Sequence, residues 1–264
     1  MTGKEIAEAL KLGGVENYIF EAKILCEELY GVFSEDKEYP DEIKIALEKR
    51  CSGYPLQYII GKWWFWDCEF FVDENCLIPR ADTESIVERA IKLIPDGGYF
   101  ADLCTGSGCI AISVLNTLKN SRADAYDLFP NTLEIAKKNA IHNKVDSRFS
   151  GLLGDVLSPT LLGEKKYDAI IAKPPYIRSD VVPTLEHDVL CEPHAALDGG
   201  DDGLIFYRAI LDNFKGNLKD GGMFIFEIGY DQGDELLDLA IERNMKCTLF
   251  KDLCGNTRGA IIYP

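Results

Sequence analysis

The sequence lacks the paired cysteines that mark zinc sites and disulfide frameworks. Nine cysteines are scattered over 264 residues, and no two of them form a Cys-x-x-Cys pair. An odd number of isolated cysteines is typical of reduced, mostly buried thiols in a cytosolic protein. The three histidines, His142, His187 and His194, lie too far apart in sequence to predict a metal triad. We therefore expect no bound metal.

Positive charge is also scarce. Lys and Arg number 28 against 44 Asp and Glu, which gives a formal net charge of −16 and a pI near 4.6. Proteins bind nucleic acid largely through Lys and Arg that displace counterions from phosphates, so this balance disfavours a nucleic-acid partner. No apolar run approaches membrane-spanning length, and the polar N-terminus lacks the apolar core of a signal peptide. We expect a cytoplasmic protein without a membrane partner.

The residue pattern changes twice along the chain and predicts two domains joined by a linker. Residues 1–55 show apolar residues at helical spacing and predict a small helical domain. Residues 56–80 contain an aromatic stretch, Trp63 to Trp66 and Phe70 to Val72, which predicts a β-hairpin linker whose tryptophans pack between domains. Residues 81–264 alternate strand and helix patterns and predict one α/β domain with a largely parallel sheet.

The pattern gives approximate bounds for the elements of that α/β domain. Strands are expected at 98–103, 122–127, 148–153, 167–172, 222–228, 246–250 and 258–263. Helices are expected at 82–94, 108–119, 131–142, 203–217 and 231–243, and Gly221-Gly222 is expected to separate a helix from the next strand.

A glycine-rich turn joins the first of these strands to a helix. Cys104-Thr105-Gly106-Ser107-Gly108 lets the backbone approach a ligand closely, and free N–H groups at the helix start favour polar or anionic ligand groups. Asp127 follows about 20 residues later, where an acid can accept ribose hydroxyls. The loop alone fits a nicotinamide cofactor as well as S-adenosylmethionine. Asp102, placed to pair with an amino group, and Asp155, placed to reach adenine, favour the latter.

The segment Lys173-Pro174-Pro175-Tyr176 follows an apolar run that reads as a buried strand. Two prolines cannot continue a hydrogen-bonded ladder, so the chain must leave the sheet at this point. In an open α/β sheet, ligands bind beyond the carboxyl ends of the strands. Together with the glycine-rich loop, this x-Pro-Pro-Tyr segment resembles class I methyltransferases that act on planar amide or exocyclic amino nitrogens.

More narrowly, the chain resembles the PrmC/HemK family, the glutamine N5-methyltransferases of peptide chain release factors. Further matches run in the family's order: Pro55-Leu56-Gln57-Tyr58-Ile59-Ile60-Gly61, Ile78-Pro79-Arg80-Ala81-Asp82-Thr83-Glu84, and residues 192–204 from Glu192-Pro193-His194 to Gly203-Leu204. The resemblance implies a Rossmann-like seven-stranded sheet whose last strand is antiparallel, with a small helical N-terminal domain and a hairpin linker. It also implies a protein substrate, the glutamine of a release factor's Gly-Gly-Gln loop. We expect a monomer.

The resemblance also assigns the candidate site residues. The catalytic segment would be Lys173, Pro174, Pro175 and Tyr176. S-adenosylmethionine, with S-adenosylhomocysteine as product, would be bound by Asp102, Cys104, Thr105, Gly106, Ser107, Gly108, Asp127, Leu128, Asp155, Val156 and Lys173. The substrate would be bound by Arg80, Glu84, Lys173, Pro174, Pro175, Tyr176 and Glu192.

Three positions depart from the family pattern. Cys104 replaces a usual glycine, Ala81 replaces a usual proline, and Lys173 stands where the family places asparagine. An amide nitrogen is a poor nucleophile, and the family's asparagine oxygen and the carbonyl of Pro174 would accept its two N–H groups and orient it. A charged lysine offers only donors, and loss of one preorganised polar contact commonly costs about 10² to 10³ in rate. We expect transfer to be weak unless Lys173 turns away, toward Glu192 or Asp198.

Four functions are therefore weighed. The favoured one is a protein-glutamine methyltransferase, and the runner-up is an impaired homologue that binds S-adenosylmethionine and release factor but methylates poorly because of Lys173. An adenine N6-methyltransferase shares the x-Pro-Pro-Tyr logic, but the acidic charge disfavours it. A dehydrogenase matches only the loop. Glu227, at the end of an apolar strand, is expected either to line the pocket or to satisfy nearby backbone donors.

Overall fold

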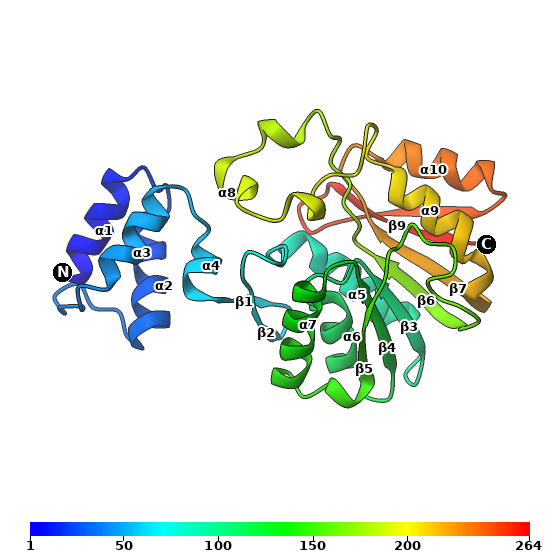
Figure 1. The fold of residues 1–264 in the computed structure, drawn as a ribbon, viewed down its shortest axis with the longest axis horizontal. Coiled ribbons are helices and arrows are strands. Elements are labelled where there is room, and N and C mark those ends of the chain that lie inside the picture. Colours follow the sequence, from blue (N-terminus) through cyan, green and yellow to red (C-terminus); the bar gives the residue numbers. More distant parts are fainter.

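The computed structural model describes residues 1–264, which form a small helical unit joined by a short hairpin to a larger α/β unit (Figure 1). The helical unit lies at one end of the elongated molecule and the C-terminus lies near the other (Figure 1). The N-terminal elements are α1 (Gly3–Leu12), α2 (Tyr18–Tyr30), α3 (Ile43–Cys51), α4 (Leu56–Ile60), β1 (Lys62–Phe65) and β2 (Cys68–Phe71).

The α/β unit begins after the hairpin. Its strands are β3 (Tyr99–Leu103), β4 (Arg122–Asp127), β5 (Phe149–Leu153), β6 (Tyr167–Ala172), β7 (Leu218–Glu227), β8 (Lys246–Lys251) and β9 (Thr257–Tyr263). Its helices are η1 (Ala81–Thr83), α5 (Glu84–Leu93), α6 (Cys109–Thr117), α7 (Pro130–His142), η2 (Asp146–Arg148), η3 (Val182–Thr184), α8 (His187–Leu190), η4 (His194–Ala196), α9 (Ile205–Phe214), η5 (Lys215–Asn217) and α10 (Gly233–Glu242).

Local sequence determines where the N-terminal helices begin and end. Thr2 starts α1 with a reciprocal cap, because its side-chain oxygen accepts from the Glu5 N–H while the Glu5 carboxylate accepts from the Thr2 N–H. Gly31 ends α2 with a φ of 79°, a left-handed conformation that glycine adopts without a side-chain clash. The apolar faces of these helices share a core of eleven buried residues, which includes Ile6, Leu25 and Ile43.

The hairpin connects the helical unit to the α/β unit. Strands β1 and β2 pair antiparallel around a two-residue turn, Trp66-Asp67. Trp63 packs against the helical core, Trp66 packs against the core of the α/β unit, and Trp64 is 62% exposed. Two of the three tryptophans therefore pack where the sequence predicted, and the third faces solvent.

The seven-stranded sheet has the order β5-β4-β3-β6-β7-β9-β8. All neighbouring pairs are parallel except those of β9, which runs antiparallel to both β7 and β8. The chain order changes direction between β3 and β6, since β4 and β5 lie on one side and β6 lies on the other. Ligand clefts of open parallel sheets form at such a switch point, beyond the carboxyl ends of the strands.

Helices cover both faces of this sheet. Successive strand residues point to opposite faces, so Phe100 belongs to one core and Ala101 to the other. The first core has 25 buried residues and packs α5, α6 and α7 on the sheet, and the second has 23 and packs α9 and α10. The predicted seven-stranded, largely parallel sheet with helices on both faces is confirmed, with β9 as the antiparallel last strand.

The predicted bounds differ from the structure mainly at β7. This strand begins at Leu218, so Gly221-Gly222 lies inside it and does not separate it from the preceding helix. Gly221 has a φ of 77°, and the pairing of β6 with β7 shifts register at this point. A glycine pair in a strand permits such a bulge, which the sequence alone did not separate from a turn.

Cysteines are less buried than the sequence suggested. All nine are free, but Cys26, Cys68, Cys76 and Cys109 alone are buried, and Cys254 is exposed. Among the helices, none combines the length and the apolar character needed to cross a membrane. No group of three or more His, Cys, Asp or Glu side chains is arranged to hold a metal ion.

Candidate active site

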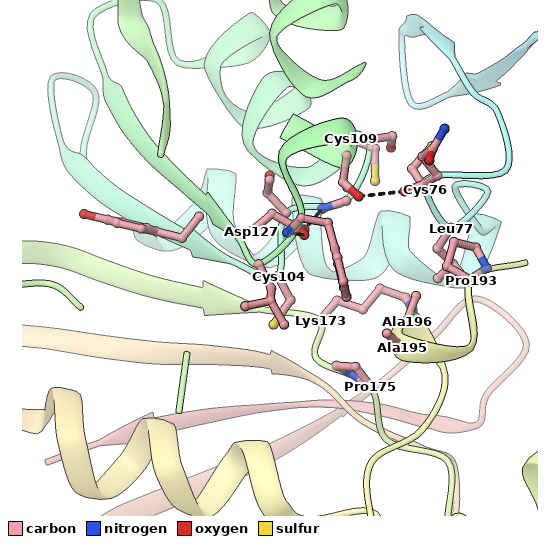
Figure 2. Close-up of a pocket in the computed structure, with 18 of the residues that line it drawn as sticks. Cys76, Leu77, Cys104, Cys109, Asp127, Lys173, Pro175, Pro193, Ala195 and Ala196 are labelled. Atoms are coloured by element: carbon pink, nitrogen blue, oxygen red, sulfur yellow. Dashed lines mark hydrogen bonds between the residues drawn. The ribbon is translucent and has the colours of Figure 1, made fainter. Parts of the chain in front are cut away.

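A cavity of about 640 Å3 opens at the carboxyl ends of β3, β4 and β6 (Figure 2). The glycine-rich loop, the ends of β4 and β6, and the loops around residues 74–80 and 193–198 supply its walls. Predicted site residues that line it are Arg80, Cys104, Thr105, Gly106, Ser107, Asp127, Leu128, Asp155, Val156, Lys173 and Pro175. Segments far apart in the sequence therefore meet at the sheet's switch point, as the motif positions predicted.

The loop after β3 has a left-handed backbone at three positions. Cys104, Gly106 and Gly108 have φ values of 59°, 56° and 83°. A methyl group added to Gly108 would lie 2.8 Å from Ile112 Cδ1, so this glycine also permits close packing against α6. Cys104 is the one non-glycine residue of the three and carries the strain that a side chain meets in this conformation. A glycine at position 104, as the resemblance implies, would adopt this conformation without that strain.

Asp102 lies beneath the loop and does not line the cavity. It is 1% exposed; its Oδ2 accepts a hydrogen bond from Thr105 Oγ1 at 2.7 Å, and its Oδ1 has no partner. Burial raises the pKa of Asp102 to about 7, against the lowering effect of Thr105. A buried oxygen without a donor is rare in folded proteins and is suited to a ligand cation.

Asp127 ends β4 and holds the loop in place. Its Oδ2 accepts from the Gly106 N–H at 2.9 Å (Figure 2), and its Oδ1 accepts from the Phe129 N–H at 3.2 Å. Burial raises the pKa of Asp127, while the hydrogen bond from Gly106 opposes this change. Each carboxylate oxygen keeps a further lone pair, so the side chain can still accept a ligand hydroxyl.

Asp155, Val156 and Leu128 form the outer part of the cavity. Asp155 is exposed, and its Oδ1 accepts from the Leu157 N–H at 2.8 Å. Val156 is 7% exposed and Leu128 is 52% exposed. An apolar wall with one acidic acceptor at the rim suits a planar ligand group that has an amino substituent.

Lys173 follows β6 and lies between Cys104 and the Ala195-Ala196 segment (Figure 2). Its side chain is 13% exposed, and its Nζ lies 3.5 Å from Glu227 Oε1 and 5.1 Å from the centre of the Tyr176 ring. Burial alone would lower the pKa of Lys173, but Glu227 and Tyr176 raise it above its ordinary value. The lysine is therefore a buried cation at neutral pH.

The partner of Lys173 differs from the sequence prediction. Glu192 and Asp198 were the predicted partners of Lys173. Instead, Glu192 forms an ion pair with Arg80, and Asp198 Oδ1 accepts a hydrogen bond from Ser179 Oγ at 2.7 Å. The paired carboxylate is Glu227, 54 residues beyond Lys173. Ala172 and Phe226 are register partners in β6 and β7, so the residues that follow them are neighbours. Recognising that these two strands pair would have identified Glu227.

A second cavity of about 280 Å3 adjoins the first. Seven of the nine residues that line it are hydrophobic, and Tyr176, Ile177 and Leu185 are among them. Four residues line both cavities, namely Leu77, Arg80, Lys173 and Ala196. Lys173 therefore stands at the junction between a large cavity and a smaller, mostly apolar one.

Arg80 and Glu192 fasten the segment that covers this junction. Glu192 is 5% exposed, forms an ion pair with Arg80, and accepts from the Ile78 N–H at 2.9 Å. Burial raises the pKa of Glu192, and Arg80 opposes this change. Arg80 lines both cavities, whereas Glu192 lines neither and acts by fixing the segment.

Glu84 lies away from the predicted substrate site. It lines neither cavity, and its Oε1 accepts from the Trp66 N–H at 2.8 Å, so it holds the hairpin turn against α5. Pro174 is buried and also lines neither cavity, although Pro175 and Tyr176 line one each. The motif spacing predicted this group of residues but not which side chains face the cavities.

Several further cavity residues were not among the predicted site residues. Thr83 and Phe206 line the large cavity, and so does His194, although Thr83 and His194 lie within the matched segments 78–84 and 192–204. They come from η1, α9 and η4, which reach the site only through the tertiary fold. Thr83 is 1% exposed and donates to Glu227 Oε2 at 2.6 Å, so it belongs to the Lys173 pair.

Comparisons with known proteins agree with this geometry. A family model described as Methyltransferase small domain matches residues 85–211. A release factor glutamine methyltransferase from Moorella thermoacetica is 44% identical over 197 residues, which cover 74% of this chain and 69% of that protein. A protein of the same name from Clostridium botulinum is 36% identical over 239 residues, which cover 89% of this chain and 83% of that protein.

Solved structures show the same fold at low identity. The hMettl16 catalytic domain, in complex with MAT2A 3'UTR hairpin 6, has a TM-score of 0.57 at 17% identity and covers 75% of this chain and 76% of that one. A human methyltransferase 10 domain containing protein has a TM-score of 0.52 at 18% identity and covers 75% of this chain and 90% of that one. These similarities establish the architecture alone.

Proposed function

The chain belongs to the release factor glutamine methyltransferase family, and on this premise we propose that it methylates a peptide chain release factor. The acceptor atom is the side-chain N5 of the glutamine in the Gly-Gly-Gln loop. The single observation that carries the proposal is the identity to relatives of this name over most of the chain, 44% with one and 36% with another.

The residues of the large cavity fit S-adenosylmethionine. The loop offers N–H groups at the start of α6, and Asp127 offers acceptors for ribose hydroxyls. Asp102 does not line the cavity, but beneath the loop its unpartnered Oδ1 would attract the positively charged amino group. Asp155, Val156 and Leu128 would enclose the adenine. When bound, this cofactor supplies a methyl group on a positively charged sulfur and leaves as S-adenosylhomocysteine.

The smaller cavity fits the side chain of glutamine. Its apolar walls would hold the methylene groups, and Tyr176 would border the amide plane. As the family resemblance implies, the backbone carbonyl of Pro174 would accept one amide N–H, although Pro174 lines neither cavity. Lys173, at the junction, can donate only, so its contribution is a charge-assisted hydrogen bond to the amide oxygen.

The chain's own residues must also exclude water and leave the nitrogen free to react. Leu77 and Arg80, in a segment fastened by Glu192, line both cavities. The acceptor nitrogen would gain the methyl carbon as the carbon–sulfur bond breaks, and would then lose one of its two protons to water at the cavity mouth, which restores a neutral secondary amide. Neither step needs a metal or a redox group.

We infer further that residues 1–55 recognise the release factor, with residues 56–80 as the linker and residues 81–264 as the methyltransferase domain. The helices of residues 1–55 have their own core, which supports their treatment as a separate recognition unit. The net charge of −16 supports a protein partner and no direct contact with nucleic acid. We propose a cytoplasmic location, because the proposed substrate belongs to the translation machinery, and a monomer, as expected from the sequence.

The impaired-homologue alternative gains no support from the relatives. It differs from the main proposal only in the rate of transfer, since both require the same two cavities. The substitution Lys173→Asn therefore decides between them, because it restores the family's acceptor at the junction.

Transfer of a labelled methyl group from S-adenosylmethionine tests the proposed substrate class. We expect label on an intact release factor and none on a release factor whose Gly-Gly-Gln glutamine is replaced by alanine. A duplex RNA and a duplex DNA serve as competing acceptors in the same mixture. Label on either nucleic acid, with none on the release factor, would overturn the proposal.

A further inference from the structure

A buried ion pair occupies the point where the two cavities meet. Lys173 lines both of them, and its side chain is 13% exposed, while the side chain of Glu227 is 2% exposed. Taking a charged group out of water is unfavourable unless an opposite charge and hydrogen bonds compensate it. The compensation at this site comes from Glu227, because Glu192 and Asp198 are engaged by Arg80 and Ser179.

Glu227 is itself held from several directions. Thr83 Oγ1 donates to its Oε2 at 2.6 Å, and Tyr176 OH donates to its Oε1 at 3.4 Å. Tyr207 OH donates to its backbone carbonyl at 2.7 Å, which fixes the end of β7. The carboxylate is thus fixed before it meets Lys173, and Oε1 faces the ammonium at 3.5 Å.

The neighbours of Lys173 leave Glu227 as its one anionic anchor. Tyr176 and Cys109 are neutral at neutral pH, because burial raises the pKa of each. Arg80, the other cation that lines both cavities, repels Lys173 and is itself held by Glu192. Without Glu227 the ammonium would be a buried charge with no fixed position, in a space that the substrate amide must enter.

We propose that Glu227 is a positioning residue that fixes Lys173 at the junction and allows this chain to transfer a methyl group with lysine at position 173. This inference rests on the proposed function and extends it to a residue outside the x-Pro-Pro-Tyr segment. The pair keeps the ammonium on the β7 side of the junction and directs its remaining donors to the amide oxygen. Glu227 acts through Lys173, with Thr83 and Tyr176 as its supports.

A purely electrostatic effect and a positioning effect make different predictions. Glu227→Gln removes one negative charge whichever residue occupies position 173, so a simple field effect would reduce the rate equally with lysine and with asparagine there. Positioning predicts a larger loss when lysine is present, because only lysine depends on the anchor. The difference between the two losses measures the coupling.

The experiment compares four full-length chains: the native chain, Glu227→Gln, Lys173→Asn and the double variant. kcat and KM for an intact release factor are measured for each. We expect Glu227→Gln to reduce kcat at least about tenfold more in the lysine background than in the asparagine background, by analogy with loss of one preorganised contact. Equal losses in the two backgrounds would overturn the proposal. Asp212→Asn, which breaks an exposed ion pair with Arg243 away from both cavities, serves as the control.

Thermal unfolding of the same four chains separates this proposal from the proposed function. Glu227→Gln should lower the midpoint more when lysine is present, since it leaves a buried cation unpaired. If no chain methylates a release factor, the proposed function is wrong. Equal losses of the unfolding midpoint in the lysine and asparagine backgrounds would overturn the proposed anchoring of Lys173 by Glu227. If Glu227→Gln does not fold with lysine present, Glu227→Asp replaces it. This variant keeps the negative charge but moves it back by one methylene. It must reduce kcat more with lysine than with asparagine at position 173.

Discussion

Asp102, beneath the glycine-rich loop, is a carboxyl of the site whose pKa is raised close to neutral. Its pKa is about 7 in the folded chain, against an ordinary value of 3.8, because the carboxyl is buried. The folded chain therefore holds a proton that the unfolded chain has released between about pH 4 and 7. It follows that the contribution of this carboxyl to folding stability is lost as pH rises through that window.

Cofactor affinity should have the opposite dependence on pH. A cationic amino group prefers the ionised form of Asp102, so the affinity for S-adenosylmethionine should fall as pH falls below about 7. The expected slope approaches tenfold per pH unit at about pH 6. Calorimetric titration at several pH values measures it, and Asp102→Asn should weaken binding and flatten the slope. An unchanged slope in that variant would assign the titration to another group.

Single residues also show how much of the site could be predicted from the sequence. Gly106, Gly108 and Asp127 were identified by their spacing, because the chemistry of a glycine-rich loop is encoded within about 25 neighbouring positions. Glu227 was assigned no definite role, because its contact with Lys173 depends on the pairing of β6 with β7. The family resemblance assigned Glu84 to substrate binding, yet its carboxylate accepts a hydrogen bond from the Trp66 N–H.

At the scale of elements, α7 joins the hairpin to the glycine-rich loop. Asn139, which is fully buried on α7, accepts from the Phe71 N–H at 2.7 Å and donates to the carbonyls of Phe71 and Ser107 at 3.0 and 2.9 Å. One side chain thus bonds the linker strand β2 and the loop before α6. Its loss would leave one buried and two part-buried backbone groups without this partner.

Asn139→Ala should therefore affect both stability and cofactor binding. We expect the free energy of unfolding to fall by about 3 kcal/mol, since unpaired buried polar groups cost roughly 1 to 3 kcal/mol each and partly recover by relaxation. The affinity for S-adenosylmethionine should fall about tenfold, because Ser107 loses its support. Urea unfolding and calorimetry measure the two effects.

Asn143 on the same helix end offers the matched control. Its side chain donates to the Glu69 carbonyl at 2.9 Å, so it reaches the hairpin but not the glycine-rich loop. Asn143→Ala should lower stability with a smaller change in cofactor affinity. If both variants weaken binding equally, the hairpin and not the loop contact is responsible.

Elements were predicted more reliably than their junctions. The strands at 122–127 and 167–172 were predicted to the residue, because short apolar runs bounded by polar residues have few alternatives. The start of β7 was placed four residues late, because the bulge at Gly221-Gly222 has the same local signature as a turn. The short helices α8, η3 and η4 were not predicted, since segments of three or four residues carry no periodic signal.

At the scale of the whole molecule, the residues that line the two cavities come from the end of the linker and from the α/β unit. The helical unit lies to one side of the α/β unit (Figure 1). The chain's excess of acidic residues, 44 against 28 basic ones, predicts that it does not bind phosphate backbones nonspecifically. Architecture, cofactor cleft and family membership therefore agree on one reaction. Lysine at position 173, in place of the asparagine that the resemblance implies, bears on the rate of methyl transfer.

We propose that a chain with Lys173 at the junction still methylates its protein substrate. The most direct test is to incubate an intact release factor with the native chain and S-adenosylmethionine, and then to fragment the product in a mass spectrometer. We expect one added methyl group, located on the side-chain nitrogen of the Gly-Gly-Gln glutamine. An unmodified glutamine, from a chain shown to be folded and to bind S-adenosylmethionine, would contradict it.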